Sequence, residues 1–68
     1  MKNSIKEGRI RKDITQAELA QLVGVSRQTI NTIESNRYAP SVVLALKIAR
    51  VFNKPVEELF QLEESDYS

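Results

Sequence analysis

Hydrogen-bonding side chains gather in one short stretch of this 68-residue chain, between residues 27 and 32. Four of them share one side of the helix that this stretch predicts: Arg27, Gln28, Asn31 and Thr32. The last three follow Arg27 by one, four and five residues, a spacing that turns the set away from Ile30 and Ile33. Such side chains read base edges, whereas a protein-binding surface would expose aromatic or large aliphatic residues. Taken alone, Arg27 and Gln28 fit solvated residues of a first helical turn better, and contact with a nucleic acid is the alternative that the surrounding motifs must decide.

Catalytic and metal-binding chemistry has little support in the sequence. The chain contains no cysteine and no histidine, which excludes disulfides, thiolate catalysis, serine–histidine–aspartate triads and zinc sites built on those ligands. The close acidic pairs are Glu57–Glu58 at a predicted helix start and Glu63–Glu64 in the tail. We therefore expect no enzyme activity, no metal, no cofactor and no small-molecule substrate.

The charge is divided unevenly along the chain, although the net charge is only +1. Residues 1–54 hold all ten basic residues against four acidic ones, which gives +6. Residues 55–68 hold five acidic residues and no basic one, which gives −5. A basic body suggests an anionic partner, and a solvated surface with an acidic solubilising end explains the same division. Charge alone leaves both readings open.

Length and composition fit one small domain, with 41% hydrophobic and 28% charged residues. We expect the domain to cover residues 1–62 and a polar acidic tail to cover residues 63–68. No apolar run approaches the roughly 18–20 residues that a membrane span needs, so no membrane partner is expected. The first residues lack the apolar segment of a signal peptide, which predicts a cytoplasmic protein.

Helix signals divide the chain into five segments, at about residues 4–12, 15–24, 26–36, 42–52 and 55–62. Ile5 and Ile10 are the apolar positions of the first segment. The fourth is apolar on nearly every side and is expected at the centre of the core. Pro55 suits the first position of the fifth, whose apolar face would carry residues 59, 60 and 62. No alternating strand pattern stands out, so we predict an all-α fold.

Local signals are clearest around the second and third segments. Thr15 and Glu18 form a capping box, which marks a helix start. Gly24 can adopt the left-handed conformation that ends a helix, and Ser26 can cap the next one. Asn36 can end that next helix in the same left-handed conformation. Two short helices joined by a glycine turn define a helix-turn-helix unit at about residues 16–35.

The motifs of this unit resemble the Cro/C1-type helix-turn-helix family, also called the XRE family. The resemblance rests on TQAELA at residues 15–20, VGVSRQTI at residues 23–30 and LALKIA at residues 44–49, and it covers roughly residues 4–60. It implies a five-helix lambda-repressor-like domain that binds double-stranded DNA with its third helix in the major groove. It also implies a transcriptional regulator, a repressor or autoregulator, that binds a pseudo-palindromic operator as a homodimer.

The resemblance also assigns roles to individual residues. Base contacts are expected from four residues of the third helix: Arg27, Gln28, Thr32 and, in second rank, Asn31. Phosphate contacts are expected from Gln16, Thr29, Arg37 and Tyr38. Thr29 could instead cap its helix, and Tyr38 could instead cover Ile33. A structural ion pair is expected between Arg9 and Glu34.

Three residues depart from the family pattern: Gly8, Asn36 and Val43. Gly8 stands where many relatives have an apolar residue, so the first helix would pack less tightly. Val43 stands where a polar residue is common. A dimer interface is expected from Val43, Val56, Phe60 and Leu62. The alternative function is a protein-interaction module of the same fold, an antitoxin or antirepressor, with the acidic tail as its working surface.

Overall fold

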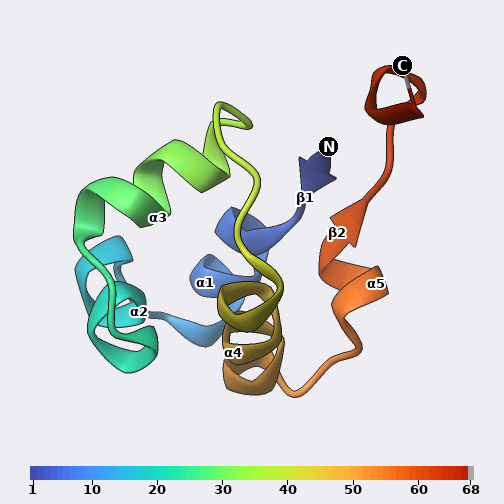
Figure 1. Ribbon diagram of the computed structural model, residues 1–68. Helices are drawn as coiled ribbons and strands as arrows, with labels where there is room; N and C mark the ends of the chain where they lie inside the picture. The colour runs from blue at the N-terminus through green and yellow to red at the C-terminus, as the bar shows by residue number, and fades with distance from the viewer. Residues whose placement is uncertain (68) are drawn as a thin grey trace.

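The computed structural model describes residues 1–67 and is built mainly from helices (Figure 1). The α-helices are α1 (Ile5–Lys12), α2 (Gln16–Val23), α3 (Arg27–Glu34), α4 (Val42–Phe52) and α5 (Val56–Leu59). Two short strands, β1 (Lys2–Asn3) and β2 (Phe60–Gln61), and a 3-10 helix, η1 (Glu64–Tyr67), complete the described chain. The predicted all-α class is confirmed, with a minimal sheet added. Residue 68 of the expected tail lies outside the described residues.

Hydroxyl side chains fix the starts of α2, α3 and α4. The Thr15 hydroxyl accepts the amide of Glu18 at 3.0 Å, and the Glu18 carboxylate accepts the amide of Thr15 at 2.9 Å. The capping box is therefore present. Ser26 and Ser41 cap α3 and α4 in the same way, each accepting the amide three residues later. Each such cap is worth about 1 kcal/mol of helix stability.

The core lies where α1, α2, α3, α4 and α5 meet. Its largest fully buried side chains are Ile5, Leu19, Ile30, Ile33, Ile48 and Leu59. Burying each stabilises the fold by about 1.5–3 kcal/mol relative to leaving it exposed. Ala20 is only 3% exposed, in the helix that packs against both α3 and α4. No buried residue in the described part of the chain is polar or charged.

α4 contributes to the core as expected, and both α1 and α4 also leave apolar residues on the surface. Ile10 is 64% exposed rather than buried, because α1 turns only Ile5 fully into the core. α4 is not enclosed on all sides: Leu44 and Ile48 are buried, whereas Val42, Val43 and Leu46 face outward. In a chain this short there is too little protein to cover the outer side of a central helix.

The expected fifth helix was too long. Pro55 is the N-cap residue rather than the first helical residue, and α5 ends at Leu59. Phe60 is extended, with φ −125° and ψ 127°, and lies opposite Asn3 in an antiparallel pairing of β2 with β1. Leu62 follows this strand and does not share a helix face with Phe60. The ends of the chain therefore lie side by side (Figure 1).

Pairing of the two strands brings the start of the chain to its acidic end. The Met1 ammonium lies 3.0 Å from the Glu63 carboxylate and 3.1 Å from that of Asp66. Hydrogen bonds to these two carboxylates raise the pKa of the Met1 ammonium. The hydrogen bond from the Glu63 amide is the largest cause that lowers the pKa of Asp66, and the Met1 ammonium lowers this pKa further. Both groups are therefore charged at neutral pH.

None of the helices formed by residues 1–67 has the length and apolar character that crossing a membrane requires.

Candidate nucleic-acid interface

The α2–α3 connection is a tight turn that sets the angle of α3. Gly24 ends α2 with φ 76°, and the amide of Val25 donates to the Ala20 carbonyl at 3.0 Å. Ser26 then caps α3, so the turn between the two helices contains three residues. The left-handed conformation at Gly24 is one that other residues adopt only with strain. A short turn, made possible without strain by Gly24, therefore sets the position of α3 against α2.

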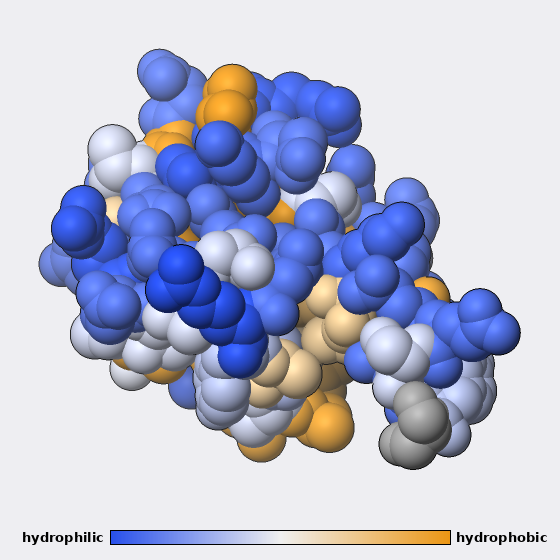
Figure 2. Space-filling model, turned by 90° about the horizontal axis from the view of Figure 1, so that it is seen from above, coloured by the Kyte–Doolittle hydropathy of each residue, from blue (hydrophilic) through white to orange (hydrophobic). Residues whose placement is uncertain are grey.

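α3 turns its apolar side inward and its polar side outward. Ile30 and Ile33 are fully buried, while Arg27, Gln28 and Asn31 are exposed. None of these three exposed side chains has a hydrogen bond or ion pair within residues 1–67. The face that carries α3 and the loop after it is largely hydrophilic (Figure 2). The sequence-predicted polar residues are therefore together and free to meet a ligand.

The two threonines of α3 are engaged within the helix. The Thr32 hydroxyl donates to the Gln28 carbonyl at 2.7 Å, which leaves its methyl group and both oxygen lone pairs for other contacts. The Thr29 hydroxyl lies 2.9 Å from that of Ser26, beside the cap of α3. Both threonine side chains are half-buried. Thr29 thus supports the start of α3 locally, which was the alternative left open for it.

A polar network under α3 joins three helices. Arg9 of α1 binds Glu34 of α3 through two hydrogen bonds, 2.6 Å from Nε to Oε2 and 3.1 Å from Nη2 to Oε1. Arg9 Nη1 also donates to the Ile14 carbonyl at 3.0 Å. Gln16 Nε2, at the start of α2, donates to Glu34 Oε1 at 3.1 Å. Glu34 therefore fixes Gln16 and Arg9 at once.

The ion pair is well shielded from water, with side-chain exposures of 11% for Arg9 and 6% for Glu34. The hydrogen bond to Glu34 raises the pKa of Arg9 above its ordinary value, so the guanidinium is permanently charged. Glu34 is the only acidic residue of α3, and its charge is matched internally. The outward side of α3 consequently carries the positive charge of Arg27 with no opposing carboxylate.

The loop after α3 presents the remaining expected contacts. Asn36 adopts the left-handed conformation with φ 62°, as the sequence predicted, and Arg37 and Tyr38 follow it. Arg37 is exposed, and Tyr38 is 50% exposed. The Tyr38 side chain therefore leaves much of its surface open rather than lying fully over the core.

Asn3 is a contributor that the sequence reasoning missed. Its side-chain amide donates to the Ile33 carbonyl at 2.8 Å and to the Asn36 side-chain oxygen at 3.0 Å. Asn3 in β1 thereby holds the end of α3 and the start of the loop that carries Arg37. The contact joins residues 30 positions apart, and no local motif signals it.

The residues expected at a dimer interface do not all lie on the surface. Val43 is 63% exposed and Leu62 is 64% exposed, while Val56 is half-buried. Phe60 is only 9% exposed and belongs to the core, so it was wrongly grouped with the surface residues. Val42 and Leu46, which were not among the expected residues, are also exposed on α4, as is Val43.

A short turn between two helices, with a free polar side on the second one, defines a helix-turn-helix protein. A sequence profile of the helix-turn-helix family matches residues 5–59, and the chain belongs to this family, in its Cro/C1 type. The family consists of non-enzymatic, DNA-binding transcriptional regulators. The predicted family is therefore confirmed.

Individual relatives span bacteria, archaea and a phage. The HTH-type transcriptional regulator YgzD of Bacillus subtilis is 47% identical over 66 residues, which cover 97% of this chain and all of the relative. The HTH-type regulator MJ0272 of Methanocaldococcus jannaschii is 46% identical over 66 residues, with coverages of 97% and 100%. The ImmF control region 10 kDa protein of Bacillus phage phi105 is 36% identical, covering 87% of this chain and 66% of the phage protein.

Among solved structures, the fold resembles the restriction-modification controller protein C.AhdI from Aeromonas hydrophila. The TM-score is 0.75 at 32% sequence identity, over 82% of this chain and 85% of the controller protein. The similarity supports the arrangement of the helices described above.

Proposed function

We propose that this protein is a sequence-specific regulator of transcription that inserts α3 into the DNA major groove. The observation that carries the proposal is the exposed, unpaired set of Arg27, Gln28 and Asn31 on the outward side of α3. Arg can bond guanine O6 and N7 bidentately, and Gln or Asn can do the same with adenine N6 and N7. Groups with no internal partner bind bases without first breaking a bond inside the protein.

Phosphate contacts would surround this reading surface. Gln16 lies at the start of α2 and has one N–H committed to Glu34, which leaves the second N–H of the amide for a phosphate oxygen. Arg37 and Tyr38 lie at the other end of α3, on the loop held by Asn3. Contacts at both ends of the helix would fix its register in the groove. Thr32 would contribute its methyl group toward a thymine.

Two copies are needed, because one α3 contacts too few base pairs to select an operator. A homodimer with reading helices about 34 Å apart would reach adjacent major grooves and require a pseudo-palindromic site. The exposed apolar residues of α4, which we call the α4 patch, are Val42, Val43 and Leu46, and Val56 shares a hollow with Leu46. Apolar residues grouped in this way on a small domain favour an interface between copies.

Repression or self-regulation is the proposed outcome, in the cytoplasm where the DNA is. The names of two relatives, a phage control-region protein and a restriction-modification controller, support control of a small locus. An interaction module that works through its acidic tail has less support. Glu63 and Asp66 of that tail are already paired with the Met1 ammonium, so two of the three acidic side chains in residues 63–67 are engaged within the protein.

Fluorescence anisotropy of labelled duplexes tests the proposal. The specific duplex is sought in two sources. One is the DNA upstream of the protein's own gene, and the other is a pool of randomised duplexes enriched through rounds of selection. A scrambled duplex is the reference. The specific duplex should bind at least about 10³-fold more tightly than the scrambled one at physiological salt. Binding to neither duplex at low salt, where phosphate contacts are strongest, would contradict the proposal.

Matched variants locate the reading surface. Arg27→Ala and Gln28→Ala should each reduce discrimination by about 1–3 kcal/mol at one base pair while leaving weak, salt-sensitive binding. Lys47→Ala and Gln21→Ala remove the same kinds of group from exposed positions on α4 and α2, and they should change neither property. An equal loss in all four variants would argue against α3 as the reading element.

A further inference from the structure

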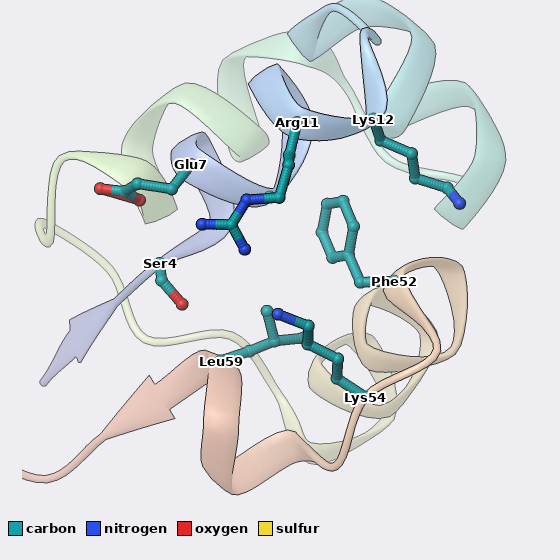
Figure 3. Close-up of a pocket in the computed structure, with 8 residues that line it drawn as sticks. Ser4, Glu7, Arg11, Lys12, Phe52, Lys54 and Leu59 are labelled. Carbon is teal, nitrogen blue, oxygen red and sulfur yellow. The ribbon is translucent and has the colours of Figure 1, made fainter.

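A second concave site lies away from α3, between α1, the end of α4 and α5 (Figure 3). The hollow has a volume of about 400 Å³, within the range of roughly 300–1,000 Å³ typical of small-molecule sites. Its apolar lining comes from Gly8, Phe52 and Leu59. None of its lining residues is among those assigned above to DNA or to the α4 patch.

Gly8 leaves this hollow open. A Cβ atom built on Gly8 would meet three ring carbons of Phe52 at 3.4–3.5 Å, which is close to ordinary van der Waals contact. A larger side chain at this position would therefore extend over the Phe52 ring and occupy the space. Without one, Phe52 remains half-buried and presents part of its ring to the hollow. The departure of Gly8 from the family pattern thus has a structural consequence.

Two cationic side chains, Arg11 and Lys54, lie next to this apolar lining. Arg11 and Lys54 extend into the space between α1 and the α4–α5 connection, whereas the Glu7 carboxylate and the Lys12 ammonium point away from it (Figure 3). The Arg11 and Lys54 side chains have no hydrogen bond or ion pair within residues 1–67. The Ser4 hydroxyl at the edge already donates to the Glu58 carbonyl at 3.3 Å. The unpaired groups that extend into the hollow are therefore positive, while the unpaired Glu7 carboxylate lies at its edge.

We propose that this hollow binds a small amphipathic carboxylate, with its apolar body against Phe52 and its anionic head between Arg11 and Lys54. The planar fork of Arg11 suits a carboxylate bidentately, and Lys54 adds a second charge. An aromatic body would lie against the exposed part of the Phe52 ring, beside Gly8. The DNA-binding domain would thereby contain its own ligand site.

The site also touches the helix that supports α3. Gly8 and Arg11 lie in α1 on either side of Arg9, whose guanidinium binds Glu34. An occupant of the hollow therefore contacts α1, the helix that the Arg9–Glu34 ion pair joins to α3. This placement suits a ligand whose presence the regulator responds to.

A two-dimensional amide NMR titration tests the site with three probes. Hydrocinnamate carries the aromatic body and the carboxylate, hydrocinnamamide is its neutral analogue, and inorganic phosphate carries charge alone. Hydrocinnamate should shift the amides of Gly8, Arg11, Phe52 and Lys54, with a dissociation constant of about 1 mM or below. The neutral analogue and phosphate should each bind at least about tenfold more weakly.

Variants make the test specific to the hollow. Gly8→Leu fills it and Arg11→Gln removes its bidentate donor, so each should weaken hydrocinnamate binding by at least about tenfold. Lys47→Gln loses a cation elsewhere and should bind as the unmodified chain does. Retained amide spectra and melting temperatures show that each variant is folded.

Three results would overturn the proposal. Equal binding of hydrocinnamate and its neutral analogue would mean that the cations take no part. Unchanged binding by Gly8→Leu would place the probe elsewhere. Shifts of the same amides with protein concentration alone would mean that a second copy occupies the hollow. The DNA experiment above does not depend on any of these outcomes, so the two proposals can fail separately.

Discussion

Arg9 Nε lies 2.6 Å from Glu34 Oε2, and this contact ties the first helix to the helix that carries the outward polar residues. The same carboxylate accepts Gln16 Nε2 from the start of α2. One charged group thus sets the relative positions of three helices. The geometry of the reading surface depends on it, although neither Arg9 nor Glu34 faces outward.

Removing either partner of this pair should strongly destabilise the domain. Arg9→Met or Glu34→Leu leaves a shielded charge without its partner and should lower the free energy of unfolding by about 3 kcal/mol. The double variant should recover much of the loss, because both charges are then absent. Urea denaturation of the unmodified protein, the two single variants and the double variant measures the coupling free energy between Arg9 and Glu34. Additive losses would mean that the two side chains contribute independently.

The pH dependence of the pair follows from the raised pKa of Arg9. A group whose pKa is raised by folding contributes its full stabilisation at any pH below its unfolded-state pKa. That stabilisation is lost only as the pH rises through the folded-state pKa. Even the ordinary pKa of Arg lies in strongly alkaline solution. From neutral pH upward, the arginine side of the pair should therefore keep its contribution until strongly alkaline solution.

Arg37 should act on every DNA sequence alike. Arg37→Ala removes one exposed cation beside the reading helix and should lower the slope of log K against log salt by about 1. Specific and scrambled duplexes should lose affinity to a similar extent, because a phosphate contact carries no sequence information. Anisotropy titrations at several salt concentrations measure the slope. Lys47→Ala is the matched control, and an equal change there would show a general charge effect.

The α4 patch should determine the oligomeric state. Leu46→Glu puts a carboxylate among Val42, Val43 and Val56, which an apolar interface would not tolerate without a partner charge. Sedimentation should show a shift from dimer to monomer, accompanied by weaker operator binding. Ile10→Glu alters an apolar residue of similar exposure on α1, 64% against 55% for Leu46, and should leave the dimer intact. A monomer before any substitution would contradict the proposed interface.

Two asparagines in the left-handed conformation should respond differently to glycine. Asn53 has φ 53° and no side-chain hydrogen bond within residues 1–67, so Asn53→Gly should raise the free energy of unfolding by about 0.5 kcal/mol. Asn36 has φ 62°, but its side-chain oxygen accepts the Asn3 amide. Asn36→Gly should gain less or lose stability, because that hydrogen bond is worth about 1 kcal/mol. Thermal unfolding compares the two variants.

Local chemistry explains why the helix starts could be predicted so well. Thr15, Ser26 and Ser41 each cap a helix through a contact with the residue three positions later. Such local contacts can be predicted from neighbouring residue types alone. Gly24 ends α2 for a reason that is equally local. The Cro/C1 resemblance added what spacing could not give, namely that Arg9 and Glu34 should meet across 25 positions.

Contacts between distant segments explain the errors. The expected fifth helix failed at Phe60 because that residue pairs with Asn3, and a strand of two residues has no periodicity to detect. Asn3 itself offered no signal, since its partners Ile33 and Asn36 come near it only in the folded chain. Ile10 and the outer residues of α4 are apolar and yet exposed, because apolar character does not by itself require burial.

The freedom of Arg27, Gln28 and Asn31 from internal contacts has an evolutionary consequence. Surface substitutions away from such contacts usually change stability by no more than about 0.5 kcal/mol. These three positions can therefore mutate almost neutrally with respect to folding, and under the proposed function each change would alter which operator is preferred. Duplicated copies of such a gene could diverge in target without passing through an unfolded intermediate. The same property makes this domain a suitable scaffold for a library randomised at only these three positions.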